Sequence, residues 1–380
     1  MFLISSLVIL SSYFLLFVLS YFWVDLNLTL ISWGPGNQVL ERLKWLGYFN
    51  RPLSSRLYLA IILLLVLIQI YLLFSRLIYR ESLRKLLILA GAVILLCSLA
   101  YPFLSHDIFS YLFDAKIVWH YQKNPYLYSP DQFTGDSWLR FMHWTHRTTP
   151  YGPIWIIYSL LPALFSFGRF VLNFYGLKLL NGLVFFLTGG LLLKITKTDK
   201  RVFAYWFFNP FLLIEFLVNA HNDLLMIALF FVSLFLWQKR KFSLAILTFL
   251  SLGAVKFITM LFLVWPLILF KNRRFWATWF VFFMMVGFAW EINRFQLWYF
   301  TWAFLALPLI AMTKFSWLIF FIFQALLLIF KYCPFLATGS WEGTSFFLFF
   351  QVSLVALGLF FLSLWPEFRK RIMGFLAKDK

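Results

Sequence analysis

The chain has 380 residues, of which 63% are hydrophobic, 23% are aromatic and only 12% are charged. A soluble domain carries about 25% charged residues, so this composition excludes an ordinary soluble protein and indicates a polytopic membrane protein. The net charge of +19 is spread over short basic clusters between apolar runs. This distribution excludes a nucleic-acid-binding arm, and two cysteines, Cys97 and Cys333, give no disulfide framework.

The apolar runs predict an all-α fold with about 12 transmembrane helices, within roughly 11 to 13, in a single domain over residues 1–380. Their lengths suit helices, and they lack the alternation of barrel strands. In chain order the spans are expected at 2–23, 57–78, 86–101, 172–193, 202–218, 222–238, 242–255, 257–270, 275–290, 298–312, 315–331 and 345–365. The first is expected to be retained, because it has no basic n-region and no clear small-residue cleavage site.

Two stretches depart from this simple pattern. After the first span, Gly34, Pro35 and Gly36 argue against a continuous helix. Residues 154–167 are apolar but short and contain Pro162, which favours an interfacial or re-entrant helix over a full span.

Basic clusters predict the orientation. Under the positive-inside rule, the clusters at 76–85, 194–201, 239–241 and 271–274 lie in the cytoplasm. With the N-terminus inside, residues 102–153 form an extracytoplasmic loop with interfacial helices.

The segment from Tyr101 to Pro153 is the longest interruption of the apolar pattern, and it holds four of the five histidines. Asp107 and Asp114 are seven residues apart, which places them on one face of a helix. The apolar residues between them predict a helix along the membrane surface, where a partly desolvated Asp107 is available as a general base. The alternative is an ordinary acid at a helix N-terminus capped by Ser105. We expect Asp114 to be structural, paired with Lys116 or Arg147.

The same segment offers two further motifs. Asn124, Pro125 and Tyr126 predict a rigid turn that is either a sugar-stacking surface or, as we favour, part of an interfacial aromatic belt. Arg147, just before Tyr151, suits a phosphate because its planar fork donates two hydrogen bonds. Snorkelling to lipid headgroups is the alternative.

A second polar cluster interrupts a later apolar run. Glu215, Asn219, Asn222 and Asp223 fall at helical spacing with His221 beside them, and such groups are costly in a membrane unless they face a cavity or each other. We favour a functional cavity over an interhelical hydrogen-bonded knot. No spacing supports a metal site. Lys256, Arg294 and Gln296 complete the polar set expected on the outer face.

Several motifs carry a family resemblance, and they occur in the order YPFLSHDIFSYLFD, NPYLYSP, TPYGP, NPFLLIEFLVNAHND and FQLWYFTWAFLALP. From about residue 100 to 310 the chain resembles the GT-C superfamily of polyprenyl-phosphate-sugar glycosyltransferases. It is most similar to the branch with bacterial alpha-mannopyranosyltransferases and the mannosyltransferases of phosphatidylinositol mannosides. The resemblance implies an inverting enzyme with an essential aspartate, here Asp107, and an active site facing away from the cytoplasm. Gln296 stands where some relatives carry a histidine.

The resulting hypothesis is a hexosyltransferase, with mannose expected from the family, in a bacterial or archaeal plasma membrane. It moves the sugar from a polyprenyl-phosphate donor in the lipid bilayer to a glycolipid or glycan acceptor, without a metal or cofactor. The residues expected to hold the departing phosphate are Arg147, His221, Lys256 and Arg294. Those expected to contact sugar or acceptor are Asp114, Asn124, Tyr126, Tyr151, Asn222, Asp223, Gln296 and Trp298. The alternatives are a lipid or solute transporter and a non-catalytic subunit of an envelope-synthesis complex.

Overall fold

The computed structural model describes residues 2–28, 30, 33–75, 77–256, 296, 299–303, 313–341 and 358. Every regular element in these ranges is helical, which confirms the all-α prediction for this part of the chain. The N-terminal elements are α1 (Phe2–Ser20), η1 (Tyr21–Trp23), α2 (Gly34–Phe49), α3 (Arg51–Phe74), α4 (Leu77–Arg80) and α5 (Leu83–Leu99). The middle ones are α6 (Asp107–Trp119), η2 (Pro130–Gln132), η3 (Ser137–Phe141), α7 (Pro153–Leu164) and α8 (Phe170–Ile195). The last are α9 (Lys200–Phe207), α10 (Pro210–Leu213), η4 (Ile214–Val218), α11 (Asp223–Gln238), α12 (Phe242–Leu250), α15 (Phe300–Ala303) and α16 (Lys314–Thr338).

Four of the described helices are long and apolar enough to cross a bilayer: Phe2–Trp23, α3, α8 and α16. A fifth span is present if α9 and the α10–η4 segment, which meet at a bend of 41°, cross as one broken helix. Two further apolar helices, α7 and α11, are shorter than these spans. The predicted spans at 257–270, 275–290 and 345–365, and most of 298–312, lie outside the described residues, so the described part supports four or five membrane spans.

Three predicted elements differ from the structure. Residues 34–36 begin helix α2, because Pro35 lies in its first turn, where a backbone N–H has no helical partner in any case. The predicted helix 202–218 is interrupted at Asn209, whose side chain caps α10 by accepting from the N–H groups of Phe211 and Leu212. The predicted span 242–255 ends early, since α12 stops at Leu250 after 9 residues, too short to cross a ~30 Å core.

The apolar helix α7 has 12 residues, in line with the short helix expected at 154–167. At 1.5 Å per residue it extends about 18 Å, well below the length of a span.

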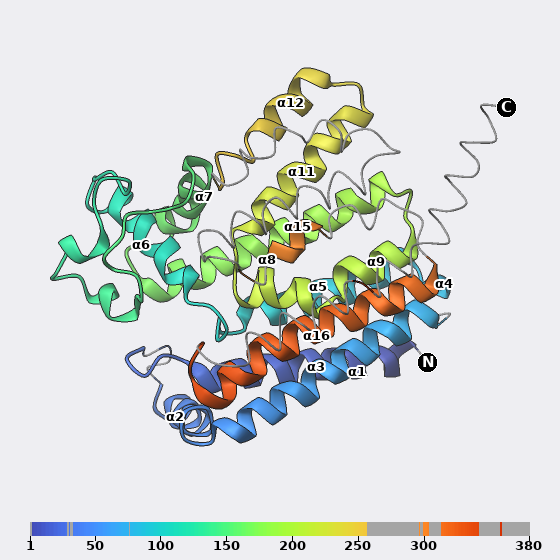
Figure 1. Ribbon diagram of the computed structural model, residues 1–380, viewed down its shortest axis with the longest axis horizontal. Helices are drawn as coiled ribbons and strands as arrows, with labels where there is room; N and C mark the ends of the chain where they lie inside the picture. Colours follow the sequence, from blue (N-terminus) through green and yellow to red (C-terminus); the bar gives the residue numbers. More distant parts are fainter. Residues whose placement is uncertain are drawn as a thin grey trace.

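The bundle brings together helices that are far apart in the chain. α16 packs along α3, α1 packs against α3 and α5, and α8 contacts α5, α7 and α11. The segment 101–153, with α6 at its start, projects from one end of this bundle, at the left of Figure 1. This segment therefore meets the ends of the long helices, where a site can form.

Helix α6 is enclosed by protein. Every residue from Asp107 to Ile117 is buried, and Phe109 packs on Phe170 and Phe174 of α8 with ring centroids 6.3 and 6.0 Å away. This burial shows that α6 packs within the protein, while its position along the membrane surface stays a prediction. Helix α6 packs against α7, α8 and η2, which a helix-surface pattern alone does not reveal.

Candidate active site

Asp107 is the first residue of α6 and the centre of the polar cluster. Its side chain is 13% exposed, and its Oδ2 lies 3.3 Å from Nδ1 of His221. The Ser105 hydroxyl accepts from the Asp107 backbone N–H at 3.3 Å, but the N-cap of α6 is His106, which makes no side-chain capping bond, so the predicted Ser105 cap is wrong. The Asp107 carboxylate faces His221 instead of bulk solvent.

A buried carboxylate stands behind His221. Nε2 of His221 lies 3.3 Å from Oε2 of Glu215. Glu215 also accepts from the Tyr332 hydroxyl at 2.7 Å and from the Asn219 amide at 3.4 Å. One imidazole thus joins two carboxylates contributed by different parts of the fold.

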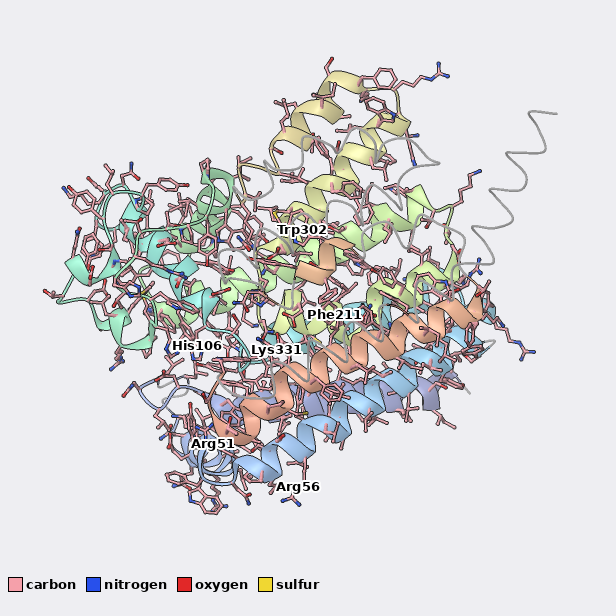
Figure 2. The ribbon with its side chains drawn as sticks, in the orientation of Figure 1. Arg51, Arg56, His106, Phe211, Trp302 and Lys331 are labelled. Carbon is pink, nitrogen blue, oxygen red and sulfur yellow. The ribbon has the colours of Figure 1, made fainter. Side chains whose placement is uncertain are left out.

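A second ion pair lies in the same region. The Lys256 ammonium donates to both oxygens of Asp223 at 3.3 and 3.2 Å, and the Trp302 indole donates to Asp223 Oδ1 at 2.7 Å. Lys256 also lies over the Tyr299 ring, 4.9 Å from its centroid. Figure 2 labels His106, Lys331 and Trp302, which mark where the outer segment, α16 and α15 contribute to this region.

The backbone between Glu215 and Asp223 is a break between helices. The π-helical turn η4 ends at Val218, and Ala220 adopts a left-handed φ of 60° before α11 begins. This break interrupts the helical spacing expected for these residues, although that spacing correctly grouped them. The Lys178 ammonium of α8 donates to the carbonyls of Leu217 and Val218 at 2.6 Å each. These carbonyls end the turn without a helical partner, so the buried cation stabilises the break.

The electrostatics of the central contact favour the charged forms. Burial lowers the pKa of His221, but its contacts with Asp107 and Glu215 outweigh burial and raise that pKa to about 9. Burial raises the pKa of Asp107, but His221, Lys256 and Arg147 outweigh it and hold the pKa below its ordinary value. At neutral pH the site therefore holds an unprotonated Asp107 beside an imidazolium.

The outer segment is fastened to the site by backbone contacts. Gly152 N–H donates to the carbonyl of Val255 and Ile154 N–H to that of Ala254, both at 2.9 Å. A side chain at position 152 would place its Cβ 2.1 Å from the Ala254 oxygen, so only glycine permits this approach. The pairing sets the position of Lys256, the next residue after Val255.

The tyrosine-rich turn braces the same loop. The Asn124 side chain accepts from Tyr126 N–H at 2.9 Å, and the Tyr126 hydroxyl donates to the carbonyl of Tyr151 at 2.8 Å. The buried Tyr151 ring meets Tyr111 edge to face, with centroids 4.8 Å apart. The contacts of Asn124 and Tyr126 favour the structural interpretation of the turn, and their contact with sugar or acceptor stays a prediction.

Asp114 has different neighbours from those expected. Lys116 forms its ion pair with Asp136, at 2.6 Å, so the predicted Asp114–Lys116 pair is wrong. Burial raises the pKa of Asp114 to about 7, against the opposing influence of a hydrogen bond with Thr149 and the charge of Arg147. Asp114 is thus a buried acid on α6 that is about half protonated at pH 7.

The remaining predicted residues divide into three groups. Arg147 is partly exposed and lies 4.7 Å from the Trp144 ring centroid, and within the described ranges no carboxylate is at ion-pair distance from it. Asn222 is buried next to Asp223, and the Gln296 carbonyl accepts from Tyr299 N–H at 3.2 Å. Arg294 and Trp298 lie outside the described residues. The expectation that no metal is needed likewise stays a prediction.

Sequence reasoning gave no role to several residues that complete the cluster. Glu215 stood out as an acid in an apolar run, and that signal was sufficient to find it. Tyr332, Trp302 and Lys178 lie in aromatic or apolar runs in which nothing distinguishes them from neighbouring residues. Only the tertiary structure brings them to Glu215, Asp223 and the end of η4.

Comparison with known proteins identifies related chains. A family model described as "Alpha-(1->6)-mannopyranosyltransferase, N-terminal domain" matches residues 21–271. Alpha-(1->6)-mannopyranosyltransferase A of Corynebacterium glutamicum is 27% identical over 174 residues, which cover 44% of this chain and 35% of that protein. The chain thus matches about a third of the length of this curated relative. No solved structure matches the chain. The resemblance drawn from the motifs is confirmed at the level of the family.

Proposed function

Because the chain belongs to the alpha-(1->6)-mannopyranosyltransferase family, we propose that it transfers mannose from a polyprenyl phosphate to a hydroxyl group of a glycolipid or glycan. Asp107 is the general base of this reaction. The observation that carries the proposal is the partly exposed Asp107 carboxylate, fixed at the start of a buried helix and in contact with His221.

The chemistry needs few groups. The acceptor oxygen attacks the anomeric carbon, its proton passes to an Asp107 oxygen, and the bond between that carbon and the phosphate oxygen breaks. The pair of electrons leaves with the lipid phosphate, and the configuration at the anomeric carbon inverts. A carboxylate of low pKa serves as the base because the attacking hydroxyl becomes acidic as its bond to carbon forms.

Cations near Asp107 are suited to the departing phosphate. Arg147 and Lys256 both act electrostatically on Asp107, so a phosphate bound next to that residue lies within their influence. Arg147 is the stronger candidate for direct contact, since Lys256 is already engaged by Asp223. Arginine also presents a planar pair of donors to phosphate oxygens.

The basic clusters support an active site on the extracytoplasmic face. Nucleotide sugars are scarce there, whereas a donor anchored by its polyprenyl tail is delivered and oriented by the bilayer itself. Holding donor and acceptor together in this way can lower the barrier by several kcal/mol, on the order of 7 to 11 in favourable cases.

The test is release of polyprenyl phosphate from a labelled polyprenyl-phosphate mannose by the purified protein, with transfer of the label to an acceptor. Asp107→Asn keeps the shape of the side chain but removes its basicity, and the rate should fall by roughly 10²-fold or more. Donor binding should change little because the base contacts the acceptor.

Asp131→Asn is the matched control, because Asp131 is an exposed carboxylate on the same outer segment. Its rate should equal that of the wild type. A transporter or a non-catalytic subunit predicts no release of polyprenyl phosphate at all, and a folded Asp107→Asn protein with the wild-type rate would place the base elsewhere.

A further inference from the structure

We propose that Glu215 is a positioning residue of the active site, which holds the His221 ring in its charged form and thereby keeps Asp107 free of its proton. The inference rests on the proposed function in one respect, that Asp107 is the base. It assigns a task to a buried acid that contacts neither substrate nor solvent.

The contacts at the two nitrogens of His221 carry the argument. Each nitrogen lies 3.3 Å from a carboxylate oxygen, Nδ1 from Asp107 and Nε2 from Glu215. A neutral imidazole has one N–H and one lone pair, so one of its nitrogens would face a carboxylate with no hydrogen between them. The imidazolium carries an N–H on both nitrogens, and it is the form that suits both contacts.

Burial determines the direction in which the three groups act. The side chain of Glu215 is 0% exposed, that of His221 is 1% exposed and that of Asp107 is 13% exposed. Of the three, Asp107 has the most exposed side chain, and Glu215 can act on it only through the ring between them. A buried carboxylate is costly unless its oxygens are satisfied, and donors from Tyr332, Asn219 and His221 surround Glu215.

The backbone fixes Glu215 and His221 to each other. The N–H of His221 donates to the carbonyl of Glu215 at 3.1 Å, across the left-handed residue Ala220. Lys178 holds the carbonyls of Leu217 and Val218 within the same turn. These contacts fix the backbone from which both side chains extend, and the His221 side chain, 1% exposed, is enclosed by protein.

Among the surrounding charged groups, Glu215 is the one that can keep His221 charged from the side away from the substrate. The titratable groups coupled to the Asp107–His221–Glu215 chain are His106, Tyr111, Arg147, Tyr151, Lys256, Tyr58, Lys331 and Tyr332, and Asp223 is coupled to two of them, Lys256 and Tyr111. Two acids contact His221 directly, and of these Glu215 is the one remote from the substrate side. Asp223 is paired with Lys256 instead.

Removing the charge of Glu215 should therefore have a chain of effects. The imidazolium loses one of its two carboxylates, and the pKa of His221, raised to about 9 by both, falls. At neutral pH His221 then becomes uncharged, and Asp107 loses its adjacent cation. The pKa of Asp107 rises, so that a higher pH is needed to free the base.

The experiment compares full-length wild type, Glu215→Gln and Tyr332→Phe. Tyr332→Phe removes a hydrogen bond to the same carboxylate without changing its charge. Mannose transfer is measured across pH, and the ring protonation of His221 is followed by NMR of ¹⁵N-histidine-labelled protein, with the His221 signal assigned by its loss in His221→Gln. In Glu215→Gln the His221 signal should become that of a neutral ring near pH 7, and the acidic limb of the activity profile should move up by about one pH unit or more. Tyr332→Phe should keep a charged ring and shift the limb much less.

Three results would overturn the inference. They are a neutral His221 in the wild type at pH 7.5, a ring that stays charged in Glu215→Gln, and an acidic limb that does not move although the ring is neutralised. The wild-type measurement decides the first even if Glu215→Gln does not fold. Failure of the proposed function is distinguishable, because it shows as activity of Asp107→Asn, while the NMR measurement needs no substrate.

Discussion

Replacing Gly152 with alanine tests how the outer segment is aligned with the rest of the site. The backbone of Gly152 has a φ of −74°, which alanine adopts without strain, so the substitution acts only through the added methyl group. That methyl group would lie 2.1 Å from the oxygen and 2.4 Å from the carbon of the Ala254 carbonyl. Both are backbone atoms that cannot rotate away, and ordinary contact begins at 3.4 Å, so the two segments must separate by about 1.3 Å.

The separation has two calculable consequences. The two backbone hydrogen bonds at 2.9 Å, from Gly152 to Val255 and from Ile154 to Ala254, would be stretched beyond hydrogen-bonding distance. Their loss should lower the free energy of unfolding by about 1 to 3 kcal/mol. Lys256 would move relative to Asp107 by on the order of 1 Å, a displacement that can reduce a reaction rate by about 10²-fold.

The assay combines the initial rate of mannose transfer with the thermal unfolding midpoint of the purified protein. Gly135→Ala is the matched control, because Gly135 lies in the same outer segment and a Cβ there would meet nothing within 4 Å. It should match the wild type in both measurements. A Gly152→Ala protein with wild-type transfer would refute the reasoning, since it would show that this pairing does not position the catalytic groups.

Asp114→Asn should alter the pH dependence of stability. The pKa of Asp114 is about 7 in the folded state and about 3.9 in the unfolded state, so the folded state binds more protons between these pH values. The folded protein therefore loses stability as the pH rises from about 3.9 to about 7. The variant should lose that slope in unfolding measurements and exceed the wild type in stability above pH 7. Lys178→Met removes two donors from the end of η4 and should lower the free energy of unfolding by about 1 to 3 kcal/mol per orphaned carbonyl, whereas Lys194→Met, at the exposed end of α8, should cost little. In a cysteine-free background, an impermeant reagent on intact cells should label a cysteine at position 131 and spare one at 239; the reverse pattern would invert the proposed orientation.

The sequence allowed the fold class and the main members of the site to be predicted, for a common physical reason. Polar residues inside apolar runs are costly in a membrane, so Asp107, His221, Asp223 and Lys256 stood out individually. The structure brings all four into one cluster. Helices such as α8, whose apolar pattern is long and unbroken, were also placed close to their observed bounds.

The pairing within the cluster could not be predicted. Glu215, Asn219, Asn222 and Asp223 fall at helical spacing, but a π-helical turn and the left-handed Ala220 interrupt the helix, and His221 faces Asp107. Such breaks depend on tertiary partners, here the ammonium of Lys178. The burial of α6 was missed because a sequence pattern does not show how many neighbours a short apolar helix acquires.

The packing of α16 on α3 determines when the site is completed during synthesis. Glu215 is made long before Tyr332, the α16 residue whose hydroxyl satisfies it, and before Trp302, which contacts Asp223. A nascent chain that has been made only as far as α12 therefore carries Glu215 and Asp223 without the donors Tyr332 and Trp302. Of the described helices α16 is the last to emerge, and its docking closes the polar cluster. The donors that satisfy the two buried carboxylates Glu215 and Asp223 are therefore the last parts of the described cluster to be synthesised.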